Sequence, residues 1–116
     1  LLKLTFTHII VDLSKGYRPI DFAAMNSSDE ILLVTQLDVS SLRNVVRVML
    51  SLNERSGLES KVRVVANRVG SSEAEISTQR AEETIGRPIF ARVPNDSRTM
   101  LASRNSGVPL IEHAPK

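Results

Sequence analysis

Four short aliphatic runs are spaced along the chain, and each ends on polar or small residues. The runs cover residues 6–13 (FTHIIVDL), 30–36 (EILLVTQ), 61–66 (KVRVVA) and 89–93 (IFARV). The first two are nearly continuous rather than alternating, a pattern typical of strands that are buried on both faces in a parallel sheet. The runs therefore predict about four strands.

Amphipathic stretches fill the gaps between these runs, and they predict helices over residues 20–25, 40–56, 72–85 and 97–104. The clearest is the second, in which Leu42, Val45 and Met49 recur at spacings of three and four. Such spacing places apolar side chains on one face of a helix, where they can cover a sheet.

Residue types at the ends of two helices indicate where each begins or stops. Ser40 or Ser41 suits the N-cap of the clearest helix, and Gly57 suits its C-terminal stop. Ser72 and Glu75 have the spacing of a capping box, which predicts the start of the next helix.

The alternation of strands and helices indicates right-handed crossovers between parallel strands. We therefore expect an α/β fold, a parallel sheet with helices on both faces, formed as a single domain over residues 1–116. A composition of 41% hydrophobic and 24% charged residues is that of an ordinary globular protein.

Composition also narrows the class of function. The chain has no Cys, which excludes a disulfide framework and a thiolate zinc site. Its formal net charge is only +2 and its arginines are scattered, so there is no strong nucleic-acid signal. No apolar run approaches the roughly 20 residues of a membrane span.

Ligands of open α/β sheets bind at the carboxyl ends of the strands, so the residues after each run are the candidates for chemistry. Asp12 ends the first run, where a carboxylate can hold Mg²⁺ through water beside nucleotide phosphates. Gly16 would let the backbone approach a phosphate. The alternative is that Asp12 only caps a turn, and the residues alone leave both interpretations open.

Asn67 and Arg68 follow the third run, and Pro94, Asn95 and Asp96 follow the fourth. The amide of Asn67 carries a donor and an acceptor, which suits recognition of adenine, with turn formation as the alternative. Helix capping is the favoured interpretation for Asn95 and Asp96.

Capping or solvation is also the default for Asp38, which stands between the second run and a serine-rich helix start.

Glycine spacing argues against a phosphate-binding loop within this chain. The five glycines are at positions 16, 57, 70, 86 and 107, so no two of them are closer than 13 residues, whereas a phosphate-binding loop needs closely spaced glycines and a lysine. Neither the P-loop pattern nor the dinucleotide-binding pattern is present. We expect the chain alone to bind ATP poorly or not at all.

Five stretches together carry a resemblance to a known family. They are THIIVDLSKG, DEILLVTQLDVSSLRN, VRVVANRVGSS, IGRPIFARVPNDSRTM and NSGVPLIEHAPK, and they span nearly the whole chain. In order and spacing they resemble the second half of a ParA/MinD-type (deviant Walker) ATPase. They are most similar to the CpaE- and TadZ-like proteins of Flp/Tad pilus assembly.

The resemblance implies a partial P-loop NTPase-like fold with nucleotide-binding residues at the strand ends. Asp12 corresponds to the Walker B-like acid beside Mg²⁺, and Gly16 to the glycine near the γ-phosphate. Asn67 corresponds to the asparagine that contacts adenine. The other residues with an implied nucleotide-binding role are Arg68, Pro94, Asn95 and Asp96.

The resemblance also implies cofactors, partners and location. ATP and Mg²⁺ would serve the parent protein, and no cofactor is expected for this chain alone. The parent would form a homodimer or otherwise self-associate, and would contact secretion or pilus assembly machinery. It would be cytoplasmic, with recruitment to the inner membrane or cell pole and no membrane segment of its own.

Two departures from the family pattern qualify this expectation. Many relatives have a proline two residues after the acid, where this chain has Ser14, and the half that carries the P-loop is absent. We therefore expect the C-terminal portion of a larger ATPase domain, inactive alone. The alternative is a non-catalytic scaffold or polar localisation domain. A receiver-like domain is disfavoured because Asp12 stands without neighbouring acids.

Overall fold

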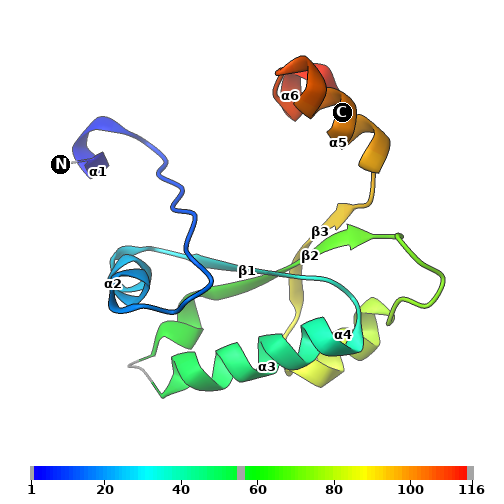
Figure 1. The fold of residues 1–116 in the computed structure, drawn as a ribbon. Coiled ribbons are helices and arrows are strands. Elements are labelled where there is room, and N and C mark those ends of the chain that lie inside the picture. The colour runs from blue at the N-terminus through cyan, green and yellow to red at the C-terminus, as the bar shows by residue number, and fades with distance from the viewer. Residues whose placement is uncertain (1, 55–56, 115–116) are drawn as a thin grey trace.

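The computed structural model describes residues 2–54 and 57–114, and a parallel sheet of three strands lies at its centre (Figure 1). The strands are β1 (Ile31–Thr35), β2 (Val62–Val69) and β3 (Ile89–Pro94), hydrogen-bonded in that order. The helices are α1 (Leu2–Thr5), α2 (Pro19–Ser27), α3 (Val39–Asn53), the 3-10 turn η1 (Leu58–Lys61), α4 (Thr78–Ile85), α5 (Ser97–Ser106) and α6 (Leu110–His113). The α/β class and the parallel sheet are confirmed.

Residues 6–13 do not form the predicted first strand. They run as extended chain between α1 and α2, away from the sheet, and Ile10 is 95% exposed (Figure 1). A strand is stabilised by hydrogen bonds to a neighbour and by burial, so β-forming residue types alone do not make one. Within the described part of the chain, this segment pairs with no strand, and the sheet has three strands rather than four.

One face of the sheet carries the core. Val62, Val64 and Ala66 alternate along β2 and are fully or almost fully buried. They lie in two apolar clusters. Helix α2 contributes Met25 to these clusters, α3 contributes Val45 and α4 contributes Ala81. The alternation has the period of two that strand geometry imposes on side chains.

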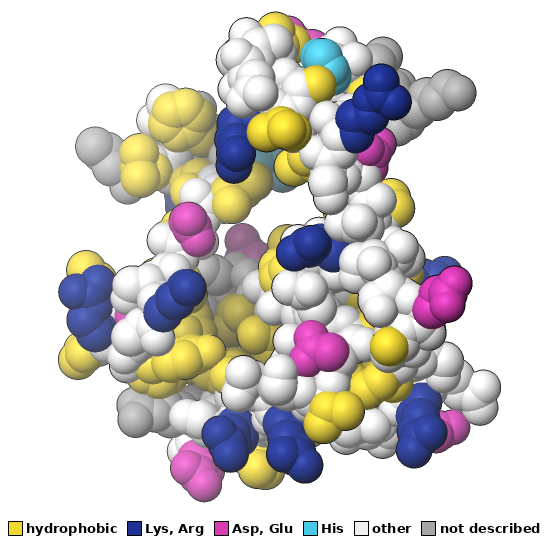
Figure 2. Space-filling model, turned by 45° about the vertical axis from the view of Figure 1, so that its right-hand side comes forward, with side chains coloured by type: hydrophobic (Ala, Val, Ile, Leu, Met, Phe, Trp, Pro, Cys, Tyr) yellow, Lys and Arg dark blue, Asp and Glu magenta, His cyan; other side chains and the backbone are white. Residues whose placement is uncertain are grey.

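The opposite face is exposed, which differs from the expectation of helices on both faces. Leu32 and Val34 of β1 are each 58% exposed and Phe90 of β3 is 60% exposed. Helices α2, α3 and α4 pack on the buried side, and α5 and α6 stand beyond the end of β3 (Figure 1). Figure 2 shows hydrophobic side chains gathered around a recess in the middle of the molecule.

Helix α3 begins earlier than its serines predict. Its N-cap is Asp38, whose carboxylate accepts a hydrogen bond of 2.9 Å from the backbone N–H of Ser41. The capping alternative for Asp38 is therefore confirmed, and Ser40 and Ser41 lie inside the first turn. The predicted end of this helix at residues 55–56 lies outside the described residues.

Helix α4 begins at Thr78 with Ser77 as its N-cap, so the capping box at residue 72 is wrong. The Glu75 carboxylate instead accepts hydrogen bonds from the backbone N–H groups of Gly70 and Ser71, at 2.9 and 2.7 Å. These contacts close a loop between β2 and α4. Because the Glu75 carboxylate is engaged in this loop, it does not cap the first turn of a helix.

Candidate functional site

The ends of β2 and β3 are joined at the carboxyl edge of the sheet. The pairing register between the two strands shifts after Ala66 and resumes at Val69 opposite Pro94, so residues 67–68 bulge out of β2. Arg68 takes the left-handed conformation there, with φ of 57°. Bulges of this kind redirect side chains at the edges of sheets and beside ligand sites.

Two hydrogen bonds hold Asn95 against this bulge. The backbone N–H of Asn95 donates to the carbonyl of Val69 at 2.8 Å, and the Nε–H of Arg68 donates to Oδ1 of Asn95 at 3.3 Å. The structure thus brings Asn67, Arg68, Pro94 and Asn95 together, as their positions after two neighbouring strands predict.

The side-chain amide of Asn67 is partly engaged by its own backbone. Its Oδ1 accepts a hydrogen bond of 3.0 Å from the N–H of the next residue, Arg68. The NH₂ group carries two donors, which suits a ligand that presents acceptor atoms.

Asp96 is the N-cap of α5. Its carboxylate accepts from the backbone N–H of Thr99 at 3.0 Å and from the Thr99 hydroxyl at 2.6 Å. These bonds, the hydroxyl first and the backbone second, hold the pKa of Asp96 below its ordinary value. The capping interpretation of Asp96 is confirmed, and its nucleotide-binding role stays a prediction.

Asp12 and Gly16 lie apart from the sheet, in the loop that leads to α2. The Asp12 side chain is exposed, and no group of three or more possible metal ligands occurs among residues 2–54 and 57–114. Asp12 therefore offers a single carboxylate. Gly16 is not in the left-handed region; the next residue, Tyr17, takes that conformation with φ of 45°.

A hollow connects this loop with the end of β2. It has a volume of about 270 Å³ and is bordered by Tyr17, by Asn67, by the end of β1 at Thr35 and Gln36, and by Asn44 on α3. The hollow thus places the residue after Gly16 near Asn67. Sequence reasoning missed Tyr17, because no pattern marks a tyrosine that adopts a positive φ.

Asp21 is the second residue that sequence reasoning missed. It is buried, and its Oδ2 accepts hydrogen bonds from the hydroxyl of Ser14 and from the backbone N–H of Arg18, each 2.8 Å long. The Arg18 bond first, and the Ser14 bond second, hold its pKa below the ordinary value. An acid two residues after Pro19, in the first turn of a helix, is the signal that points to it.

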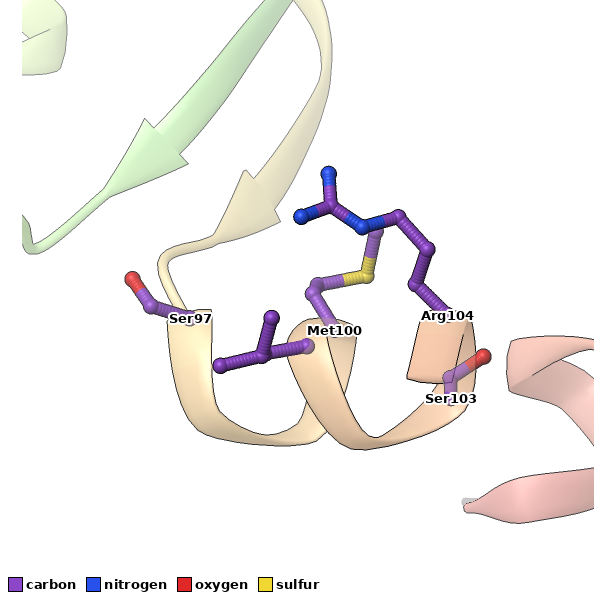
Figure 3. Close-up of a pocket in the computed structure, with 5 residues that line it drawn as sticks. Ser97, Met100, Ser103 and Arg104 are labelled. Carbon is purple, nitrogen blue, oxygen red and sulfur yellow. The ribbon is translucent and has the colours of Figure 1, made fainter. Parts of the chain in front are cut away.

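A larger hollow of about 480 Å³ lies along α5 (Figure 3). Its lining residues all come from that helix and include Met100, Leu101 and Arg104. None of the predicted site residues borders it. Among the helices described, none combines the length and apolarity that crossing a membrane requires.

No family model matches the chain. The chain is 30% identical over 111 residues to the septum site-determining protein MinD homolog, chloroplastic, of Arabidopsis thaliana, which covers 92% of this chain and 33% of the relative. Across the curated relatives that it matches, the chain spans between 33% and 39% of each relative's length.

Two solved structures share the fold. A ParA family ATPase from Chlorobium tepidum TLS superposes with a TM-score of 0.89 at 28% identity, over 99% of this chain and 48% of that one. MinD from Pyrococcus horikoshii OT3, solved with Mg-ADP, superposes with a TM-score of 0.70 at 25% identity, over 90% and 42%. The chain is thus similar, in sequence and in fold, to ParA/MinD-type ATPases.

Proposed function

We propose that this chain forms the base-binding and Mg²⁺-binding side of a nucleotide site in a ParA/MinD-like ATPase. The observation that carries the proposal is the hydrogen bond between Arg68 and Asn95, which joins two strand ends at the edge where open α/β sheets bind ligands. The MinD structure solved with Mg-ADP supports the choice of ligand.

The side chains at these strand ends and in the loop before α2 fit ATP and Mg²⁺ in part. Mg²⁺ is usually bound through one or two carboxylates, with water and phosphate oxygens as its other ligands, and the exposed Asp12 supplies one carboxylate. The NH₂ group of Asn67 can donate to a ring nitrogen of adenine. When bound, Mg²⁺ would neutralise charge on the phosphates.

A second segment would supply the phosphate-binding contacts. The glycine spacing leaves this chain without a P-loop. β1 is an edge strand, and its outer edge pairs with no described strand. The sheet face that carries Leu32 and Phe90 is exposed. This edge and this face are therefore available to further polypeptide. We propose that this chain is the C-terminal part of a larger ATPase domain.

The cellular role proposed for this ATPase is to position other machinery. Relatives named as septum site-determining proteins favour placement of a division site. The CpaE- and TadZ-like resemblance favours pilus assembly, with secretion or pilus proteins as partners and dimerisation around ATP. A non-catalytic scaffold that keeps the fold without hydrolysis is the alternative.

Replacement of Asp12 tests the nucleotide role. In a protein that joins this chain to the phosphate-binding segment, Asp12→Ala is expected to abolish Mg²⁺-dependent ATP hydrolysis, measured as phosphate release. Asp29→Ala, an exposed acid in the turn before β1, is the matched control and should have no effect. Intact hydrolysis in the Asp12 variant would refute the Mg²⁺ role.

A further inference from the structure

Asp21 is a buried carboxylate with two short hydrogen bonds to one loop. Only 4% of the residue is exposed, and both bonds, from the Ser14 hydroxyl and the Arg18 N–H, reach the same oxygen, Oδ2. A buried carboxylate is costly unless such donors satisfy it, so the loop must keep them in place. The Arg18 side chain cannot accept a hydrogen bond from the backbone N–H of Asp21 in exchange, because a guanidinium has no acceptor atom.

The same loop is anchored on both sides of Ser14. Before it, Leu13 packs against the apolar cluster that contains Met25 of α2. After it, the ring of Tyr17 lies 6.5 Å from that of Phe22, also on α2. Residues 2–12, by contrast, are exposed throughout. Contact of this segment with the apolar cluster therefore begins directly after Asp12.

Tyr17 shows that the loop is held rather than relaxed. Its φ of 45° is unfavourable for a residue with a large side chain, and such conformations persist only where surrounding contacts impose them. The contacts that flank it are the Ser14 and Arg18 bonds to Asp21.

We propose that Asp21 is a positioning residue for the loop over residues 12–16, and that it acts through the Ser14 hydroxyl. This bond fixes a residue two places after Asp12 and two places before Gly16, so it sets where both can stand relative to α2. The inference rests on the proposed function, because the position of the loop matters there only if Asp12 faces Mg²⁺.

The first test is NMR on the 116-residue chain with Ser14→Ala. Backbone order parameters of residues 13–17 are expected to fall, while those of α3 stay unchanged. The amide shift of Arg18 should follow the titration of Asp21, and its midpoint should move to higher pH in the variant. Loss of the hydroxyl donor removes stabilisation from the charged carboxylate, so the pKa rises toward its ordinary value.

Two further variants separate positioning from general stability. Ser14→Thr keeps the hydroxyl and is expected to restore both the order parameters and the titration. Ser28→Ala is the matched control, since it removes a hydroxyl bond of 2.7 Å to the carbonyl of Ala24 at the other end of the same helix. If Ser14→Ala left the loop as ordered as before, or if the control loosened it equally, the inference would be overturned.

A second measurement connects the loop to Mg²⁺. In the protein that includes the phosphate-binding segment, Ser14→Ala should raise the Mg²⁺ concentration for half-maximal ATP hydrolysis on the order of tenfold, with kcat at saturating Mg²⁺ unchanged. An unchanged Mg²⁺ requirement overturns the positioning role. A wild-type protein without hydrolysis overturns the proposed function instead, whatever the NMR result.

Discussion

At the scale of single residues, acids that follow strands make their contacts within the chain. Asp38 accepts from the backbone N–H of Ser41 at 2.9 Å, from its hydroxyl at 2.7 Å and from the hydroxyl of Ser40 at 2.8 Å. Asp96 makes the corresponding contacts with Thr99. Asp12 is not the N-cap of any of the helices α2 to α6 in the described part of the chain, which sets it apart from the two capping acids.

Removal of the Asp38 cap is expected to destabilise the fold. Asp38→Ala leaves the first turn of α3 without its acceptor, and the loss of an N-cap costs about 1 kcal/mol in the free energy of unfolding. Denaturant unfolding followed by circular dichroism measures it. Asp29→Ala serves as the control, and equal stability of the two variants would contradict the capping role.

The charge of Asp38 predicts a dependence on pH. The Ser41 N–H, followed by the Ser41 and Ser40 hydroxyls, lowers its pKa from 3.8 to about 2. Because the pKa is lowered in the folded state, its stabilisation is complete above the ordinary pKa and is lost as pH falls through about 2. Asn also caps helices, so Asp38→Asn isolates the charge. The difference in unfolding free energy between wild type and Asp38→Asn should shrink as the pH falls from 3.8 to about 2. A difference that stays constant over this pH range would contradict a stabilising role of the charge.

At the scale of elements, the bulge in β2 depends on the backbone of Arg68. Its φ of 57° suits glycine and is unfavourable for a β-branched residue. Both Arg68→Gly and Arg68→Val lose the bond to Asn95, so the difference between them reports the backbone alone. We expect the valine variant to be less stable than the glycine variant by about 1–2 kcal/mol in thermal or denaturant unfolding.

The matched control for this comparison is Arg63 on the same strand. Arg63 has no positive φ, and its surface ion pair with Glu30 at 3.4 Å contributes little. Arg63→Val should therefore be at least as stable as Arg63→Gly, the reverse of the order at Arg68. The same order at both positions would show that the left-handed backbone is not the cause.

Sequence pattern predicts the elements that are stabilised by their own residues and by near neighbours. Residues 30–36, 61–66 and 89–93 become β1, β2 and β3, and the amphipathic stretch from residue 40 becomes α3. The segment over residues 6–13 fails because a strand also requires a partner, which residue types do not reveal. The sequence predicts a start of α4 at residue 72, which is too early, because Glu75 accepts hydrogen bonds from Gly70 and Ser71 in the loop before the helix.

The candidate site is predictable to the same extent. Asn67 and Arg68 lie near the end of β2 and Asn95 directly follows the adjacent β3, so parallel topology brings them to the same end of the sheet. The backbone conformation of Tyr17 and the hydrogen bonds of Asp21 depend on the loop before α2, whose conformation depends on tertiary contacts. Neither residue belongs to a recognisable motif. Spacing in the sequence therefore predicts the strand-end residues but not the loop that faces them.

At the scale of the whole molecule, the exposed sheet face predicts self-association of the isolated chain. Leu32, Val34 and Phe90 form an apolar surface on a sheet whose first edge is unpaired among the described residues. Such surfaces and edges favour contact with other chains. Sedimentation velocity is expected to show association that increases with concentration.

A double variant identifies the surface responsible for this association. Leu32→Thr with Val34→Thr keeps residues that suit a strand but reduces the apolar area, so it should weaken association. Val39→Thr changes a residue that is similarly exposed, at 57%, but lies on α3, and should have no effect. A wild-type chain that remains monomeric at high concentration would count against the exposed face as a binding surface.

Calorimetry with ATP and Mg²⁺ tests whether the phosphate-binding contacts come from a segment outside this chain. The measurement compares this chain alone with a polypeptide in which it is joined to a phosphate-binding segment. We expect no binding to the chain alone, because no glycine-rich loop is present. The joined protein should bind ATP with Mg²⁺, and the Asp12→Ala substitution should weaken that binding. Micromolar binding of ATP with Mg²⁺ to the 116-residue chain alone would contradict the claim that the phosphate contacts come from another segment.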